Sequence, residues 1–447
     1  MLTAEQLELQ EALDAQDGRR LMRLCRRLTR NLVVTAGGYE MTLAHHVAIG
    51  ELSNGLECLK TIVNQAGAEC LSDRNQNGNT PVHLAAMFQD DTWMIYLHKT
   101  LGSDCFEVGG KHNRTAAHFG ALNLRGNSAL KWLARNLGQR CLRGLDEEGN
   151  TPLHLAAWRQ GADSMQLFKN ELGTFCFQQQ GRFKRTPVHQ AATNRTSNEA
   201  LKWLINECGS EALKVTDEHG NTAVHLASCK QDQDSLKLIK DCLGCLVFMV
   251  RGRHGFTAVH YAAMNVNGDA SLLWFVKELG SSCLLEKGTA LDQTPLHLAA
   301  QHQGERPIDV ARRSLGLSCV MQADRRRRTV VHYAAMNRRS TAALRHIVAQ
   351  LGPECLKQKD ADGSMCLHLA AQYQGLESMA LIWDCLGATA FKLEGQNSRT
   401  MVHYAAENDQ KKELISWIVR KLGHQCLLIS DSEGVTPARI SGYYEYH

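Results

Sequence analysis

The stretch "DEEGNTPLHLAAWRQG", residues 146–161, decides the fold of this chain. Its Gly-Asn pair is typical of a tight turn. Thr151 fits the position before a helix, where its side-chain oxygen can accept a hydrogen bond from the first turn. Pro152 fits the first helical position, because the N–H that proline lacks would have no partner there. We therefore predict a turn followed by a helix that buries the face containing Leu153.

Close copies of this stretch recur along the chain. Eleven of the 20 histidines occupy the same place in a copy, and after a first gap of 38 residues they lie 35 to 37 residues apart. A period this regular indicates a repeat architecture, in which each unit buries its apolar face by stacking on its neighbours. We expect each histidine to hydrogen-bond to the backbone or to the Thr hydroxyl near the turn. The eleven are His45, His83, His118, His154, His189, His225, His260, His297, His332, His368 and His403.

The copies resemble the ankyrin repeat, whose signature contains Thr-Pro-Leu-His-x-Ala. Such repeats have a period of about 33 residues, so each unit here is slightly longer. We place the additional residues at the end of the second helix and its exit loop, where Leu-Gly is followed by Cys and an apolar residue, as in residues 137–142. Gly173 is expected to end its helix in a left-handed conformation. The resemblance implies an all-α repeat solenoid of stacked helix-turn-helix units with hairpin fingers.

We expect one solenoid over residues 1–447, with about 12 repeats and a truncated C-terminal cap. Residues 1–35 are predicted to form an N-terminal capping repeat, because basic side chains flank a leucine stripe there. Residues 36–430 hold eleven repeats. Residues 431–447 keep Thr-Pro but have Arg439 in place of the histidine, which indicates a cap with only its first helix.

The repeats alternate between two kinds, so that the true unit is a pair of about 71 residues. In the Gln type, glutamine lies six residues after the histidine; in the Asn type, asparagine lies five residues after it. Four of the five Asn-type repeats also place tryptophan fourteen residues after the histidine, and the fifth has His346 there. We expect these tryptophans to pack between repeats, with a binding surface as the alternative. They are Trp132, Trp203, Trp274 and Trp417.

The predicted hairpin tips alternate in charge as well. Gln-type tips tend to be acidic, as at residues 146–148, and Asn-type tips are basic. Two interpretations stay open: neighbouring fingers pair their charges, or the tips form a surface for a partner. The arginine run at 325–328 exceeds what pairing requires and is the best single candidate for a partner contact. The candidate partner-binding residues are Lys111, Arg114, Arg182, Lys184, Arg185, Arg251, Arg253, Arg325, Arg326, Arg327, Arg328 and Arg399.

Residue pairs that suggest chemistry have structural explanations. Cys366 lies near His368, but no third group marks this repeat as one with an activated thiolate. Cys242 and Cys245 form a CxxC motif without the second pair that a structural zinc site needs, and Cys242 recurs at a template position shared with Cys385. We interpret these cysteines as packed residues. The sequence therefore predicts no catalytic residue, no metal site and no cofactor.

Composition limits the function further. The formal net charge is +4 with an isoelectric point near 8.3, too mild to indicate a nucleic-acid partner by itself. The sequence has no apolar run of about 18 residues, and its first residues lack the order of a signal peptide. With sixteen cysteines taken as reduced thiols, we expect the cytoplasm, or alternatively the nucleus.

The resemblance to ankyrin repeats implies a non-catalytic scaffold that binds a protein partner on its concave face and hairpin tips. Three alternatives stay open. The basic fingers could recognise an anionic partner, whether an acidic protein, a nucleic acid or a lipid headgroup. The chain could be a host-directed effector that an intracellular bacterium secretes. An enzyme could also hide in a divergent repeat, although the sequence does not favour it.

One copy breaks the capping rule and yields a test. Met365 occupies the cap position in the repeat of His368, so we expect that helix to lose about 1 kcal/mol of capping stabilisation. Amide hydrogens of residues 366–374 should then exchange faster than those of the Thr-capped repeat around His297. Exchange that is no faster there would contradict this prediction.

Overall fold

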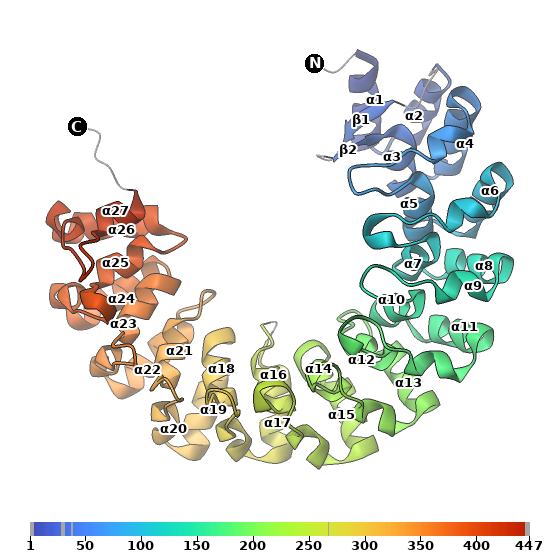
Figure 1. Ribbon diagram of the computed structural model, residues 1–447. Coiled ribbons are helices and arrows are strands. Elements are labelled where there is room, and N and C mark those ends of the chain that lie inside the picture. The colour runs from blue at the N-terminus through green and yellow to red at the C-terminus, as the bar shows by residue number, and fades with distance from the viewer. Residues whose placement is uncertain (1–3, 28–31, 37–38, 267, 443–447) are drawn as a thin grey trace. The chain divides into compact units, whose positions relative to one another are not determined.

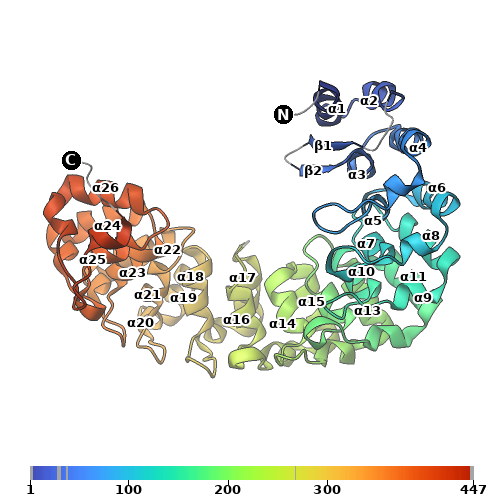
Figure 2. The same cartoon turned by 45° about the horizontal axis from the view of Figure 1, so that its top comes forward.

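The computed structural model describes residues 4–27, 32–36, 39–266 and 268–442. Within them, pairs of helices follow one another from repeat to repeat (Figure 1). The chain divides into two compact units, Met1–Ala223 and Val224–His447. In each unit, the first helices of the repeats form one layer and the second helices form another, as the turned view also shows (Figure 2).

The first unit holds the N-terminal repeats. Its first-helix layer consists of α3 (Leu43–Ile49), α5 (Pro81–Phe88), α7 (Ala116–Ala121), α10 (Pro152–Arg159) and α12 (Pro187–Ala191). Its second-helix layer consists of α4 (Gly55–Ala66), α6 (Asp91–Leu101), α8 (Ser128–Leu137), α11 (Ala162–Leu172) and α13 (Glu199–Cys208). Ahead of them lie α1 (Ala4–Asp14) and α2 (Gly18–Cys25), each of which buries one apolar face. Residues 1–3 and 28–31 of the predicted N-terminal cap lie outside the described residues.

The second unit continues the same alternation. Its first helices are α14 (Ala223–Lys230), which begins at the last residue of the first unit, α16 (Ala258–Ala263), α18 (Pro295–His302), α21 (Val330–Ala335), α23 (Cys366–Tyr373), α25 (Met401–Ala406) and α27 (Pro437–Ser441). Its second helices are α15 (Gln233–Leu243), α17 (Ala270–Leu279), α19 (Arg306–Leu315), α22 (Ala342–Leu351), α24 (Leu376–Leu386) and α26 (Lys411–Leu422). Helix α27 is the first helix of the predicted C-terminal cap, whose residues 443–447 lie outside the described part of the chain.

The start of each first helix follows the sequence prediction. Thr151 is the N-cap of α10 and Pro152 its first residue. Leu153, Ala156 and Ala157 are buried. Alanine at these contacts lets α10 pack closely against α7 and α12. The predicted buried face is therefore confirmed.

A third helical turn follows each second helix, where we placed the additional residues. Helix α11 ends at Gly173, whose φ of 76° and ψ of 175° correct the expected left-handed cap. With a positive φ and an extended ψ, this conformation is essentially restricted to glycine. The next turn, η4 (Thr174–Gln178), buries Phe177. The Leu-Gly-x-x-Cys segments thus build an exit turn that adds an apolar side chain to the core of each repeat.

A two-stranded element in the first unit was not predicted. Strands β1 (Val33–Ala36) and β2 (Tyr39–Thr42) pair antiparallel, with Val34 opposite Met41. Strand β1 packs against α1, and β2 leads directly into α3. The hairpin replaces the finger that precedes the first helix of later repeats. It adds a small sheet to a fold that is otherwise the predicted helical solenoid.

The asparagine of the Asn-type repeat ends its helix early. The first helices of Asn-type repeats have five or six residues, whereas those of the Gln type have eight. Asn123 Nδ2 donates to the carbonyls of Ala86 and Gln89 in the preceding repeat. Its Oδ1 accepts the N–H of Arg125, which turns the chain out of the helix. One side chain thus satisfies helix-end carbonyls of one repeat and terminates the helix of its own.

The glutamine of the Gln-type repeat satisfies helix-end carbonyls of the preceding Asn-type repeat. Gln160 Nε2 donates to the carbonyls of Gly120 and Asn123, at 2.9 Å each. Gln303 and Gln374 make the same contacts in the second unit. The longer glutamine side chain reaches back one repeat from a helix that is about half a turn longer. The two kinds of repeat are therefore complementary, which explains the paired period.

The tryptophans pack between repeats, as predicted. The ring centroid of Trp132 lies 5.6 Å from that of Phe106 in the exit turn of the preceding repeat. The same pairing joins Trp203 to Phe177 at 5.3 Å and Trp274 to Phe248 at 5.7 Å. In the pair of repeats with His346, Val320 stands in place of the phenylalanine. In this pair of repeats, the phenylalanine and the tryptophan are thus both replaced, by Val320 and His346.

Each of the eleven repeated histidines links two repeats. His154 Nδ1 accepts the N–H of Thr151 at 3.2 Å, and its Nε2 lies 3.1 Å from the carbonyl of Gln179 at the next finger. Because Nδ1 accepts, the ring hydrogen sits on Nε2, which donates. All eleven Nε2 atoms lie 2.8 to 3.3 Å from such a carbonyl. The expected bonding of these histidines to the backbone is confirmed.

The linking histidines predict acid sensitivity. Burial lowers the pKa of His154, and that of His118, to about 4, against about 6.5 in an unfolded chain. Between these values the unfolded chain binds more protons, so this stabilisation is complete above pH 6.5 and is lost as the pH falls toward 4. In that interval, each such histidine should lower the free energy of unfolding by about 1.4 kcal/mol for every pH unit that the pH falls.

We therefore expect the urea midpoint of the chain to fall steadily from pH 6.5 to 4.5 and to stay constant from pH 7 to 8.5. The hydrogen-bonded carboxyl group of Asp431 should respond at a different pH. Hydrogen bonds hold its pKa below the ordinary value of 3.8, so the stability that it contributes is lost at a more acidic pH than the histidine interval. A urea midpoint that does not change between pH 6.5 and 4.5 would contradict the prediction.

Candidate functional site

The predicted site residues lie on the fingers that precede the first helices. One kind of finger begins with an aspartate five residues before the helix cap. Asp146 Oδ1 accepts the N–H groups of Glu148 and Asn150 at 3.0 and 2.8 Å. Gly149 closes the turn with a φ of 77°, as the Gly-Asn pair predicted. The aspartate thus fixes the finger from inside the turn.

An Arg–Asp ion pair joins neighbouring fingers at four places. Arg114 Nε lies 3.0 Å from Asp146 Oδ2, whose side chain is 0% exposed. Burial would raise the pKa of Asp146, but hydrogen bonds from the Asn150 backbone and from Arg114 lower it on balance. The other pairs are Arg185 with Asp217 at 3.2 Å, Arg328 with Asp360 at 2.9 Å, and Arg399 with Asp431 at 3.0 Å.

Three further candidate arginines also pair within the chain. Arg182 contacts Glu148 of the preceding finger. Arg251 Nη2 lies 3.6 Å from Glu286, and Arg325 Nε lies 2.9 Å from Asp292. Neighbouring fingers therefore neutralise one another at seven of the twelve predicted residues.

The remaining candidate residues project from the finger tips. Lys111, Lys184, Arg253, Arg326 and Arg327 are exposed. In the described part of the chain, Lys111, Lys184, Arg326 and Arg327 form no ion pair. The finger at 325–328 therefore keeps two charges that pairing between fingers does not explain.

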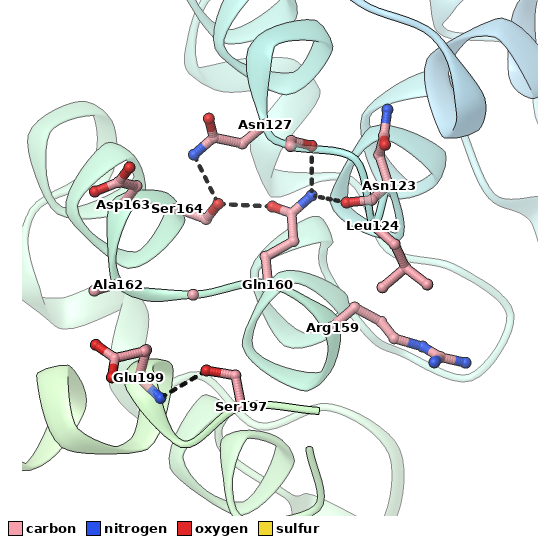
Figure 3. Close-up of a pocket in the computed structure, with 12 residues that line it drawn as sticks. Asn123, Leu124, Asn127, Arg159, Gln160, Ala162, Asp163, Ser164, Ser197 and Glu199 are labelled. Atoms are coloured by element: carbon pink, nitrogen blue, oxygen red, sulfur yellow. Dashed lines mark hydrogen bonds between the residues drawn. The ribbon is translucent and has the colours of Figure 1, made fainter. Parts of the chain in front are cut away.

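A polar hollow of about 410 Å³ opens beside α11 in the first unit (Figure 3). Gln160 lies at its centre, and its Oε1 accepts the hydroxyl of Ser164 at 2.7 Å. Asn127 Nδ2 donates to the same hydroxyl at 2.9 Å. These groups satisfy one another and the helix-end carbonyls. The hollow thus lies at a junction between an Asn-type and a Gln-type repeat, and Asn127, Gln160 and Ser164 are engaged in holding that junction.

The cysteines give no support for nucleophilic chemistry. Cys366 is buried, and burial raises its pKa well above the ordinary thiol value, which disfavours the thiolate. Both ring nitrogens of His368 are engaged, by the Met365 N–H and the Leu393 carbonyl. Among the described residues, no group of three His, Cys, Asp or Glu side chains is arranged to hold a metal ion. The interpretation of Cys242 as a packed residue is wrong, because Cys242 is exposed.

Comparison with protein families gives one match. A model described as "Ankyrin repeats (3 copies)" matches residues 153–247 and 188–285. The chain contains ankyrin repeats. The same helix pairs and histidine links continue on both sides of the matched residues. Ankyrin repeats are typically modules of protein–protein interaction.

The comparison with curated proteins finds no match. No helix of the described residues is long and apolar enough to cross a membrane.

The ion pairs between ankyrin fingers carry a signal that the sequence analysis missed. Each of the four arginines directly precedes a helix cap, and its aspartate lies 32 residues later. This constant separation across one repeat could have revealed the pairs. The alternation of charge at the tips alone left both pairing and partner binding open.

The buried aspartates predict a measurable loss of stability. We expect Asp217→Ala to lower the unfolding free energy by about 2–4 kcal/mol, because it removes two turn hydrogen bonds and leaves Arg185 without its partner. The neighbouring exposed Glu218 provides a matched control, and Glu218→Ala should change stability by less than about 0.5 kcal/mol. Urea unfolding of the full chain measures both. Equal effects of the two substitutions would contradict the role of the buried carboxylate.

Proposed function

We propose that this ankyrin repeat chain is a non-catalytic scaffold that binds a protein partner through its finger tips and the face of its first helices. The observation that carries the proposal is the linkage of fingers by histidine–carbonyl hydrogen bonds and buried Arg–Asp pairs. A surface that is already ordered loses little conformational freedom on binding. Each repeat can then add contacts without a folding step.

The exposed tip charges support a partner with acidic segments. Basic side chains at the edge of a preformed surface speed association with acidic partners and align them. Paired arginines such as Arg114 and Arg185 contribute little field, because buried carboxylates neutralise them. The unpaired Lys111, Lys184, Arg326 and Arg327 provide the accessible charge.

The distribution of paired and unpaired basic residues disfavours a nucleic acid as the main partner. Proteins that bind duplexes neutralise many phosphates with a continuous basic surface. Here seven of the twelve candidate residues already face carboxylates of the chain, and the formal net charge is only +4. A protein with a short acidic segment fits this distribution better than a long polyanion does.

Affinity capture with the full chain tests the proposal. A tip variant changes Lys111, Lys184, Arg326 and Arg327 to Ser. A control variant removes the same charge from exposed lysines of second helices and exit turns, by changing Lys99, Lys237, Lys392 and Lys412 to Ser. We expect the tip variant to lose the proteins that both the native chain and the control variant retain.

Recovery of the same proteins by the tip variant, or their equal loss from the control variant, would contradict binding through the tips. Circular dichroism of both variants should match that of the native chain, since none of the eight side chains is buried or forms an ion pair in the described structure. Captured material should also be treated with nuclease. If nuclease released it, nucleic acid would be the ligand and the proposal would fail.

A further inference from the structure

The finger between α20 (Ser318–Met321) and α21 differs from its neighbours at its tip. Asp324 is buried and anchors it: its Oδ1 accepts the N–H groups of Arg326 and Arg328 at 2.8 Å each. Its Oδ2 accepts the hydroxyl of Tyr333, also at 2.8 Å. The backbone of the tip is therefore held in place by a carboxylate beneath it, whose three hydrogen bonds involve none of the arginine side chains.

Arg327 occupies a position that carries glycine in the other fingers that begin with aspartate. In this finger Arg327 has a φ of 58°, in the left-handed region that side chains with a Cβ disfavour. Four other fingers that begin with aspartate place glycine at the same position, with φ values of 74° to 84°. They are Gly149, Gly220, Gly363 and Gly434. In further fingers Asn113, Lys184, Asp292 and Ser398 have similar φ values at the same distance from the helix cap, so this turn accommodates side chains at a small cost in strain.

The charges around this tip are arranged to leave it positive. Arg325 pairs with Asp292 and Arg328 with Asp360, so the base of the finger is neutralised. Arg326 and Arg327 are exposed and form no ion pair with any residue that the structure describes. The following finger touches the tip through Ala361, whose N–H donates to the carbonyl of Arg326 at 2.7 Å.

Glutamate stands at the equivalent contact in the first unit. There the N–H of Glu147 donates to the backbone carbonyl of His112, and the N–H of Glu218 donates to the backbone carbonyl of Phe183. At Ala361, as at Thr289 and Ser432 of the second unit, the residue at this contact carries no carboxylate. The guanidinium groups of Arg326 and Arg327 therefore meet no acidic side chain at this contact.

We infer that Arg326 and Arg327 form a docking point for a protein segment with two or more neighbouring Asp or Glu residues. Guanidinium groups bind carboxylates through paired, charge-assisted hydrogen bonds. Because Asp292 and Asp360 neutralise the neighbouring Arg325 and Arg328, only two charges are available at this tip. Two charges suit a short acidic segment better than a nucleic acid, which presents many phosphates. This inference rests on the proposed scaffold function and names the chemistry of its partner.

Glycine at the strained position gives the decisive variant. Arg327→Gly removes a charge but suits the backbone, so the urea midpoint should stay equal or rise. The probe is a fluorescein-labelled peptide of seven residues, Ser-Glu-Glu-Ser-Glu-Glu-Ser, with fluorescence anisotropy as the readout at low salt. We expect Arg326→Gln together with Arg327→Gly to weaken binding about tenfold. A control with Lys392→Gln and Lys412→Gln removes the same charge elsewhere and should bind like the native chain.

A peptide with Gln in place of Glu should bind at least tenfold more weakly to the native chain. Equal binding of the native chain and the double arginine variant would overturn the inference, as would equal binding of the Glu and Gln peptides. A single-stranded oligonucleotide of equal charge that binds more tightly, and loses that binding in the double arginine variant, would overturn it in favour of nucleic acid.

The inference and the proposed function can fail separately. If captured proteins depend on Lys111 and Lys184 while the acidic peptide ignores the arginine tip, the docking point is wrong and the scaffold function stands. If the peptide binds the tip but the four-residue tip variant captures the same proteins as the native chain, the scaffold function through the tips fails.

Discussion

The structure depends on a buried, neutral histidine that joins the start of one helix to the finger of the next repeat. Its Nδ1 accepts from the cap residue, and its Nε2 donates to a backbone carbonyl at the next finger. Protonation of the ring would break the first bond, since Nδ1 would then lose its acceptor role, whereas Nε2 donates in either state. The motif that identifies the family is thus also the bond that holds one finger at a fixed position against the next repeat.

The fingers are held by further contacts besides this histidine link. Buried aspartates hold the turns from within, and arginines of the preceding finger close over them. Together with Arg182, Arg251 and Arg325, these arginines make seven of the twelve candidate residues that pair with carboxylates of the chain. What remains at the tips is small and local, so a partner meets a few positioned charges rather than a broad basic field.

Much of the fold could be predicted from the sequence, because the repeats carry local signals: the histidine, in most repeats a threonine cap, and in some a proline at the first helical position. The exit turn could be located, and the packing of Trp132 between repeats could be anticipated. The strands of residues 33–42 could not, because they occur once and no repeated pattern marks them. The ion pairs of the candidate site were missed for a different reason: Arg114 meets Asp146 only when two fingers lie side by side, so charge alone left pairing and partner binding undecided. Exposure of Cys242 also depends on tertiary position, which a shared template position does not reveal.

The reciprocal reach of Asn123 and Gln160 has a consequence for how such an array changes length. An eight-residue helix presents its last carbonyls to asparagine, and a six-residue helix presents them to glutamine. Excision of a single repeat would bring two units of the same kind together, with a side chain of the wrong length at the joint. Removal or duplication of a two-repeat block restores every joint. Evolutionary gain and loss in this lineage should therefore proceed by blocks of about 71 residues.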